Sequence, residues 1–388
     1  MPVINRMAEL HDEITAWRRE IHANPELMYD VEQTAASVAE KLKAFGCDEV
    51  VEGIGRTGVV GIIRGKAGSD HAIGLRADMD ALPIEEESGK PWTSKNPGKM
   101  HACGHDGHTA MLLGAARYLA ETRNFSGKVA VIFQPAEEGG AGGKAMVDDG
   151  MMNRFGIEEV YGMHNVPGLP VGHFAIRPGP IMASTDEFFV TVRGKGTHAA
   201  MPNLGIDVIT IAAEIIGALQ KIVSREVDPV DSLVVSVTQV KAGFAHNVLP
   251  DTALFSGTVR CLSAEVRDMA ERRIEEIARG IAGAYGATIE YEYERSYPIT
   301  VNHEDQTIKA IDAARAVAGD NGIITDIPPV LGGEDFSYML LERPGAFIFV
   351  GNGDSAGLHN SKYDFNDEAI PHGASYWVQL VERQLPAA

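Results

Sequence analysis

The sequence predicts an α/β fold in which a mostly parallel sheet lies between layers of helices, with a ferredoxin-like α+β domain inserted into the chain. Three observations lead to this prediction. Short apolar runs alternate with helical patterns in both outer parts of the chain, polar residues follow the ends of those runs, and the middle part has a different order of elements. Strands that alternate with helices are typical of parallel sheets covered on both faces.

The first part of the chain, residues 1–183, alternates helical and strand patterns. An apolar helical face runs from Leu10 to Ile21 and ends at Pro25. Further helices are expected over 32–45, after 101–108 and over 143–149, and strands over 59–63, 72–75, 129–133 and 160–163. Ligands bind at the carboxyl ends of the strands in such sheets, so the polar residues that follow these strands are candidates for a site.

The pattern changes near residue 184. A strand over 187–193, a helix over 208–223, strands over 232–240 and 252–262, a helix over 264–284 and a strand over 288–294 follow in turn. This β-α-β-β-α-β order is the ferredoxin-like unit, and Asp207 and Ser263 stand where its two helices need N-caps. We therefore expect a domain of residues 184–295 inserted between the two parts of the main domain, 1–183 and 296–388.

Charge and composition exclude several classes of function. The 388 residues carry a net charge of −20, which repels phosphate backbones and anionic lipid, so we expect neither nucleic-acid nor membrane partners. There is no run of 18 apolar residues and no apolar leader at the N-terminus. The three cysteines, Cys47, Cys103 and Cys261, are odd in number and far apart. These features predict a cytoplasmic protein with free thiols.

Residues 101–108, His-Ala-Cys-Gly-His-Asp-Gly-His, concentrate groups that bind transition metals. Imidazole, thiolate and carboxylate are the ligands that Zn²⁺ and related ions take. Cys103 and His105 are two residues apart, so a loop could bring them together whereas a helix would separate them. We therefore expect the next helix to begin at Thr109. A Gly-rich turn with a buried cysteine is the alternative for this stretch taken by itself.

Four other polar segments follow expected strands. They contribute carboxylates or imidazoles, namely Asp78 and Asp80, Glu137 and Glu138, His164, and His359. Any one of them could be a cap or a solvated loop residue, but five segments at corresponding strand ends favour a metal site. Neighbouring side chains in extended backbone point in opposite directions, so Glu138 could bind a metal while Glu137 accepts a proton from water. The donors suffice for two metal ions.

Nine stretches spread over nearly the whole chain carry a family resemblance: Arg18–Leu27, Arg76–Pro83, Met100–His108, Gln134–Glu138, Gly162–His164, Gly196–Pro202, Asn247–Asp251, Gly333–Phe336 and Gly357–His359. With them, the sequence resembles the amidohydrolase subfamily of the aminoacylase-like metallopeptidases. This subfamily includes hippurate hydrolases, bacterial N-acyl-amino-acid amidohydrolases and plant auxin-conjugate hydrolases. The stretches occur in the family's order, which makes the match specific.

The resemblance implies a role for each candidate residue. The implied metal ligands are Cys103, His105, Glu138, His164 and His359. Glu137 would be the general base and Asp80 would support a histidine ligand. His198 would donate a hydrogen bond to the oxyanion in the partner subunit's site, and Asn247 would lie near the substrate. Two divalent ions per subunit (Zn, Mn, Ni or Co) and a homodimer or dimer of dimers are also implied.

Two positions leave questions open. Asp78 stands where the wider superfamily commonly has a histidine, and the Cys103–His105 pair compensates for it. Because thiolate favours Zn²⁺ whereas oxygen-rich sites accept Mn²⁺, the identity of the metal stays open. Glu334 and Asp335 belong to a familiar motif without an assigned mechanistic role, and a purely structural role, in the loop or in support of the site, explains them as well as a role in the reaction.

The implied reaction is metal-dependent hydrolysis of the amide bond of N-acyl amino acids of the hippurate type, by metal-activated water. It releases a carboxylic acid and a free amino acid. A dipeptidase or carboxypeptidase of the same superfamily is the alternative. A cysteine hydrolase with Cys103 as nucleophile and His105 or His108 as base would leave the paired glutamates unused. A non-catalytic binder would not need Glu137.

Overall fold

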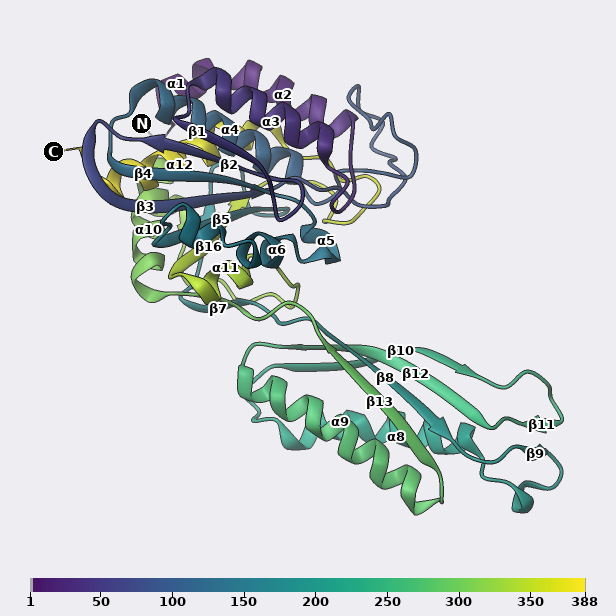
Figure 1. The fold of residues 1–388 in the computed structure, drawn as a ribbon. Coiled ribbons are helices and arrows are strands. Elements are labelled where there is room, and N and C mark those ends of the chain that lie inside the picture. The colour runs from purple at the N-terminus through teal and green to yellow at the C-terminus, as the bar shows by residue number, and fades with distance from the viewer. Residues whose placement is uncertain (1–2, 388) are drawn as a thin grey trace. The chain divides into compact units, whose positions relative to one another are not determined.

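The computed structural model describes residues 3–387 and divides them into two compact units, which are described separately (Figure 1). Unit 1 contains the chain up to Ile181, the segment Val301–Pro328 and the chain from Asp335 onward. Unit 2 contains Met182–Thr300 and the short segment Pro329–Glu334. The predicted α/β fold with an inserted α+β unit is confirmed.

Unit 1 is built on an eight-stranded sheet with the order β1-β2-β4-β3-β5-β16-β6-β15. Its four central strands, β4, β3, β5 and β16, run parallel to one another, and the antiparallel pairs lie toward the edges. The strands are β1 (Glu49–Ile54), β2 (Gly58–Arg64), β3 (Ala67–Asp78), β4 (Ser126–Gln134), β5 (Glu159–Val166), β6 (Phe174–Ala175), β15 (Ile323–Ile324) and β16 (Gly345–Gly351). The strands β4, β5 and β16 are almost entirely buried, and β3 is buried from Ala72 onward, as expected for a sheet covered on both faces.

Helices cover both faces of this sheet (Figure 1). The larger group packs on one face and consists of α2 (His11–Ala23), α3 (Glu32–Phe45), α4 (His105–Thr122), α10 (Glu304–Ala318) and α12 (Ile370–Gln384). On the other face lie α6 (Gly142–Asp148) and α11 (Ser337–Glu342). Shorter elements are α1 (Asn5–Glu9), α5 (Glu137–Gly140), α7 (Met151–Arg154), η3 (Asp320–Gly322), η4 (Asp367–Ala369), β7 (Gly179–Met182) and β14 (Thr300–Asn302). Among the described residues, no helix combines the length and apolarity needed to span a membrane.

Unit 2 has the predicted β-α-β-β-α-β order. Its antiparallel sheet has the order β10-β12-β8-β13, and α8 and α9 pack on one face (Figure 1). The elements are β8 (Asp186–Arg193), β9 (Thr197–His198), η1 (Pro202–Leu204), α8 (Val208–Lys221), η2 (Ile222–Glu226), β10 (Leu233–Ala242), β11 (Val248–Leu249), β12 (Thr252–Cys261), α9 (Ala264–Ala284) and β13 (Thr288–Arg295). Asp207 and Ser263 cap α8 and α9 as predicted.

Three local expectations were wrong. The helix after the histidine motif begins at His105 and not at Thr109, because Gly104 adopts a left-handed conformation (φ 91°) that turns the chain directly into α4. Glu137 and Glu138 are not extended. They start the short helix α5, because Ala136 before them adopts a left-handed conformation (φ 52°) that ends the extended backbone of the preceding segment. His164 lies inside β5 and does not follow it.

Candidate metal centre

Four segments of unit 1 bring thiol, imidazole and carboxylate groups together at the carboxyl edge of the central strands. Three overlapping triads of residues contribute these groups, and the three ligand atoms of each triad lie within 4.8 Å of one another. The triads are Cys103, His105 and His164; Cys103, Glu138 and His359; and His105, Glu137 and Glu138. Two triads share Cys103 and two share His105. The structure therefore unites all five predicted ligands and Glu137 in one cluster.

Two buried histidines present the same ring nitrogen to the cluster. His105 Nδ1 lies 2.8 Å from the backbone carbonyl of Asp80, and His164 Nδ1 lies 2.6 Å from that of Asn165. A carbonyl only accepts hydrogen bonds, so each Nδ1 carries a proton and Nε2 is the nitrogen that a metal would use. His164 Nε2 lies 3.4 Å from Cys103 Sγ. Both rings are thus oriented as metal-binding imidazoles usually are.

A divalent cation fits this donor set. His105 Nε2 and Glu138 Oε1 lie 3.9 Å apart and both are buried, and within residues 3–387 His105 Nε2 has no hydrogen-bond partner. Buried polar atoms are ordinarily satisfied, and a metal ion between these two would satisfy His105 Nε2 and bind the Glu138 carboxylate. Glu138 Oε1 also lies 3.2 Å from His359 Nε2, whose residue is exposed and adopts a left-handed backbone (φ 61°).

The surrounding charge also favours a cation. Burial lowers the pKa of His105, but the carboxylates of Asp78 and Asp80 outweigh burial and raise that pKa to about 10. Burial and the nearby carboxylates of Glu138 and Glu137 raise the pKa of the Cys103 thiol well above its usual range. A thiol with a raised pKa is a poor nucleophile by itself, whereas a bound metal would deprotonate it.

Asp80 holds the two glutamates in place. Its carboxylate oxygens accept hydrogen bonds from the backbone N–H groups of Glu137 and Glu138, each at 3.0 Å. The same carboxylate lies 3.4 Å from His105 Nδ1, which is closer to the Asp80 carbonyl. Asp80 therefore links the segment after β3 both to the α5 turn and to the first residue of α4.

A hydrogen-bonded framework lies beneath the cluster and was not predicted. His108 Nδ1 donates to Asp78 at 2.7 Å, and His108 Nε2 accepts from the backbone N–H of Asn165 at 2.9 Å. Both ring nitrogens are occupied, so His108 is not placed to bind a metal. The Asn165 side chain donates to the carbonyl of Cys103 at 2.6 Å and accepts from the Tyr363 hydroxyl at 2.6 Å. His108 is part of the histidine motif, whereas nothing in the sequence signals Tyr363.

His198 and Asn247 belong to unit 2, whereas the cluster belongs to unit 1. They lie side by side, because β9 pairs with β11 and the backbone N–H of Ala199 donates to the Asn247 carbonyl at 2.9 Å. His198 Nδ1 accepts a hydrogen bond from the backbone N–H of Ala200 at 3.1 Å. Both residues are exposed, and the ring of His198 keeps its Nε2–H available as a donor.

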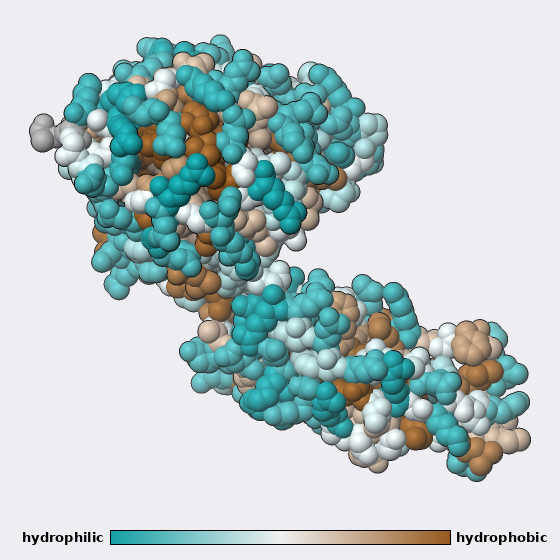
Figure 2. All heavy atoms as spheres, in the orientation of Figure 1, coloured by the Kyte–Doolittle hydropathy of each residue, from teal (hydrophilic) through white to brown (hydrophobic). Residues whose placement is uncertain are grey.

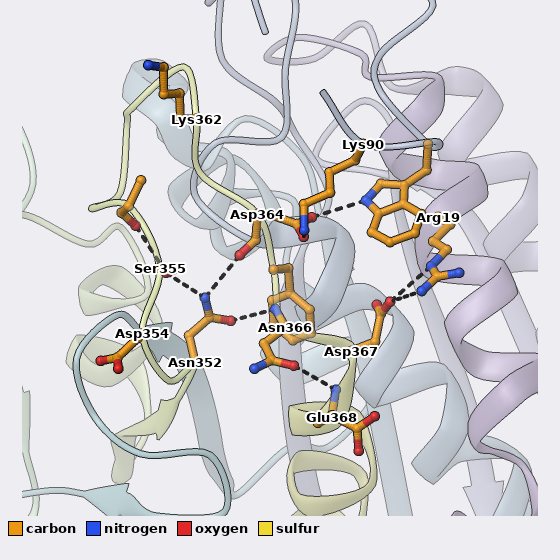
Figure 3. A pocket seen from close by; sticks show the side chains of 13 residues that line it. Arg19, Lys90, Asn352, Asp354, Ser355, Lys362, Asp364, Asn366, Asp367 and Glu368 are labelled. Carbon is orange, nitrogen blue, oxygen red and sulfur yellow. Dashed lines mark hydrogen bonds and ion pairs between the residues drawn. The ribbon is translucent and has the colours of Figure 1, made fainter. Parts of the chain in front are cut away.

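A cavity of about 430 Å³ lies against the loop that carries His359 (Figure 3). Paired charges line it: Lys90 Nζ lies 3.0 Å from Asp364, and Arg19 lies 2.7 Å from Asp367. The Trp92 indole also donates to Asp364 at 3.1 Å. These pairs tie the loop to α2 and to the segment around Trp92, so they support the position of His359.

Comparisons with known proteins agree with this site. The model of peptidase family M20/M25/M40 matches residues 74–383. The chain is 42% identical to a hippurate hydrolase from Campylobacter jejuni, covering 99% of this chain and 100% of that protein. It is 43% identical to thermostable carboxypeptidase 2 from Saccharolobus solfataricus, covering 95% of each. The crystal structure of Bacillus subtilis YXEP, described as a dinuclear metal binding peptidase from the M20 family, superposes with a TM-score of 0.87 at 34% identity, covering 98% of this chain and 100% of that one.

The parallel sheet, the donor cluster at its carboxyl edge and these full-length relatives define a metal-dependent amidohydrolase. The chain belongs to peptidase family M20/M25/M40. The family resemblance seen in the sequence is therefore confirmed.

Proposed function

We propose that this protein hydrolyses the amide bond of N-acyl amino acids of the hippurate type, releasing a carboxylic acid and a free amino acid. One observation carries the proposal: the carboxylate of Glu137 lies beside the metal-binding donors His105 and Glu138, on a turn that Asp80 holds by two backbone hydrogen bonds. A site that only bound metal would not need that additional carboxylate. The full-length similarity to a hippurate hydrolase supports the class of substrate.

Cys103, His105, Glu138, His164 and His359 would hold the metal, and the two triads that share Cys103 favour two ions. A divalent metal ion bound there supplies a Lewis acid that polarises the amide carbonyl and acidifies water. Zn²⁺ is our first choice because a thiolate is among the donors, with Mn²⁺, Ni²⁺ and Co²⁺ as the other candidates. Because a thiol ligand must stay reduced, the cytoplasm is the compartment that we propose.

Glu137 would act as the general base. It takes a proton from the attacking water and returns it to the nitrogen of the leaving amine, so that the amino acid departs as a neutral amine. Asp80 contributes by accepting a hydrogen bond from the backbone N–H of Glu137, which fixes the backbone position from which the Glu137 side chain extends. Asn165 and His108 contribute beneath the site by holding the Cys103 carbonyl and Asp78.

We further propose a homodimer in which His198 donates to the oxyanion of the partner subunit's site and Asn247 contacts substrate. The strand β10 is an edge of its sheet, and exposed apolar side chains lie near its end, among them Val240 and Phe244. Figure 2 shows apolar surface at the end of unit 2 that holds β9 and β11. An exposed edge strand and an apolar patch both favour association with a second copy.

A carboxypeptidase is the second candidate function, favoured by the 43% identity to a thermostable carboxypeptidase. Both reactions need the same base and the same donors, so the site alone does not separate them. A cysteine hydrolase is disfavoured, because the pKa of Cys103 is raised and both nitrogens of His108 are already hydrogen-bonded.

A substrate series tests the proposal. The purified protein, loaded with Zn²⁺ or Mn²⁺, is assayed on N-benzoylglycine, N-acetyl amino acids, dipeptides and N-blocked peptides. We expect kcat/KM to be highest within the N-acyl amino acids. If kcat/KM were highest on N-blocked peptides of two or more residues, the protein would instead be a carboxypeptidase. If it were highest on free dipeptides, the protein would be a dipeptidase.

A further inference from the structure

We propose that Asp335 is a positioning residue that holds the turn carrying Glu137 and Glu138 in its working conformation. This inference rests on the proposed function, because it gives Asp335 a role in delivering the base. Asp335 is completely buried in unit 1, at the point where the chain returns from Glu334 of unit 2. The donor cluster of Cys103, His105, Glu138, His164 and His359 does not include it, although its carboxylate lies within 4.8 Å of that of Glu137.

Asp335 binds both ends of the glutamate turn. Its Oδ1 accepts from the Gln134 side-chain amide at 2.7 Å, and its Oδ2 accepts from the backbone N–H of Gly143 at 2.7 Å. Gln134 is the last residue of β4, and Gly143 lies in the first turn of α6. The residues between these two anchors include both glutamates. One carboxylate therefore clamps the two ends of the segment, while Asp80 binds its middle.

The turn needs such a clamp because its backbone is strained. Ala136 (φ 52°) and Ala141 (φ 53°) both adopt the left-handed conformation, which residues other than glycine rarely take. They stand immediately on either side of α5, the turn that starts with Glu137. A strained backbone persists only where its surroundings hold it, so a weakened clamp would let the turn relax and move the Glu137 carboxylate.

The clamp is also continuous with the framework beneath the cluster. Arg76 is fully buried and donates to Asp335 Oδ1 at 3.0 Å, to Gln134 Oε1 at 2.8 Å and to Asp78 Oδ2 at 2.7 Å. Asp78 in turn accepts from His108. The position of the glutamate turn is thereby tied to the strand that carries Asp78 and to the start of α4, where His105 lies.

The test uses Asp335→Asn, which keeps the size of the side chain but places an amide NH₂ opposite the donors of Gln134 or Gly143. Glu159→Gln is the matched control, since Glu159 is also buried and bonded to Lys309 and Tyr161, but begins β5 at the end away from His164. Hydrogen exchange of the metal-free proteins is followed by mass spectrometry. We expect faster exchange over residues 135–143 in Asp335→Asn and the wild-type rate there in the control.

Kinetics separate positioning from simple stability. In Asp335→Asn we expect kcat to fall about 10–100-fold, the usual effect of losing a supporting hydrogen bond around a metal site, with KM changed less than kcat. In a Glu137→Gln background, assayed with metal in excess so that a displaced Glu138 ligand does not limit metal binding, the same change should cost less than about 3-fold, because the base that it positions is already lost. Equal fold losses in both backgrounds, or unchanged exchange over 135–143, would overturn the inference. If Glu137→Gln alone kept full turnover, the proposed function would fail instead.

If Asp335→Asn does not fold, Gly143→Ala replaces it. An added Cβ would lie 2.9 Å from the Asp335 carbonyl oxygen and 3.1 Å from Gln134 Oε1, so it pushes directly on the clamp without changing charge. The same local increase in exchange and the same loss of kcat are expected. Wild-type exchange and kcat in this variant would overturn the inference.

Discussion

The ring nitrogens of His105 and His164 show, at the scale of single residues, how the chain prepares its site. In each ring a backbone carbonyl accepts from the Nδ1–H, which leaves Nε2 as the nitrogen that faces the cluster. The sequence predicted that these two histidines and Cys103 would meet, because their residue types and strand ends pointed to a metal. It did not predict the carbonyl partners, since backbone groups carry no signature in the sequence.

Cys103 is expected to bind metal more strongly than any other thiol of the chain. Cys103→Ala should lower the affinity for Zn²⁺ by at least about 10–100-fold, because it removes an anionic donor shared by two triads. Competition with a coloured chelator measures this affinity in the metal-free protein. Cys261→Ala, which removes a buried thiol of unit 2, is the control and should bind as wild type. Equal affinity in the two variants would remove Cys103 from the ligand set.

His22 should make the stability of unit 1 depend on pH. Burial lowers the pKa of His22, but the carboxylate of Asp106 and hydrogen bonds to Asp106 and Glu86 outweigh burial and raise the pKa to about 9. A histidine whose pKa is higher in the folded chain than in the unfolded chain stabilises the fold below the unfolded value of about 6.5. That stabilisation is lost as the pH rises through about 9, and the shift corresponds to about 3 kcal/mol.

Urea unfolding of the metal-free protein at a series of pH values checks this. Between about pH 6.5 and pH 10, the free energy of unfolding of the wild type should fall by about 3 kcal/mol more than that of His22→Gln. The two proteins should therefore approach each other in stability at high pH. Parallel curves would mean that the ion pair of His22 with Asp106 contributes nothing that depends on protonation.

At the scale of elements, the sequence predicted a helix end correctly where a single local signal, such as an N-cap residue, determines it. Asp207 was predicted to cap α8, and its carboxylate accepts from the backbone N–H of Ile209 at 3.0 Å. The start of α4 and the shape of the glutamate turn were missed. There, Gly104 and Ala136 take left-handed conformations that the surrounding hydrogen bonds impose, and for Ala136 the sequence gives no hint.

The cap of α8 can be tested directly. Asp207→Ala should lower the free energy of unfolding of unit 2 by about 1 kcal/mol, because the first turn of α8 loses its side-chain acceptor. Thermal or denaturant unfolding followed by circular dichroism measures the change, and metal binding at unit 1 should stay as in the wild type. A stability equal to that of the wild type would show that water replaces the carboxylate without cost.

At the scale of the whole molecule, the change of pattern near residue 184 predicted the inserted unit and its β-α-β-β-α-β order. Both follow from hydrophobic periodicity, which local sequence records well. The return of Pro329–Glu334 to unit 2 was not predicted, because this segment has no periodic pattern of its own. The sequence also left Asp335 without a role, since its partners Gln134 and Gly143 lie about 200 residues away.

The proposed dimer predicts complementation between two inactive variants. Glu137→Ala and His198→Ala should each be nearly inactive, with a loss of about 10²–10³ in kcat for the missing oxyanion donor. Co-expressed, they form mixed dimers in which one site has an intact Glu137 and receives an intact His198. Random pairing should restore about a quarter of the wild-type activity per subunit. If mixed dimers are isolated and remain inactive, His198 acts on its own subunit or not at all.

The central claim, that Glu137 is the base beside a metal held by its neighbours, is tested most directly by Glu137→Gln. The amide keeps the size and the backbone hydrogen bond to Asp80 but does not accept a proton from water. We predict that the variant binds the wild-type amount of metal, measured by elemental analysis, while kcat on the best N-acyl amino acid falls about 10²–10⁴-fold. Turnover near the wild-type rate, with metal content confirmed, would contradict the account.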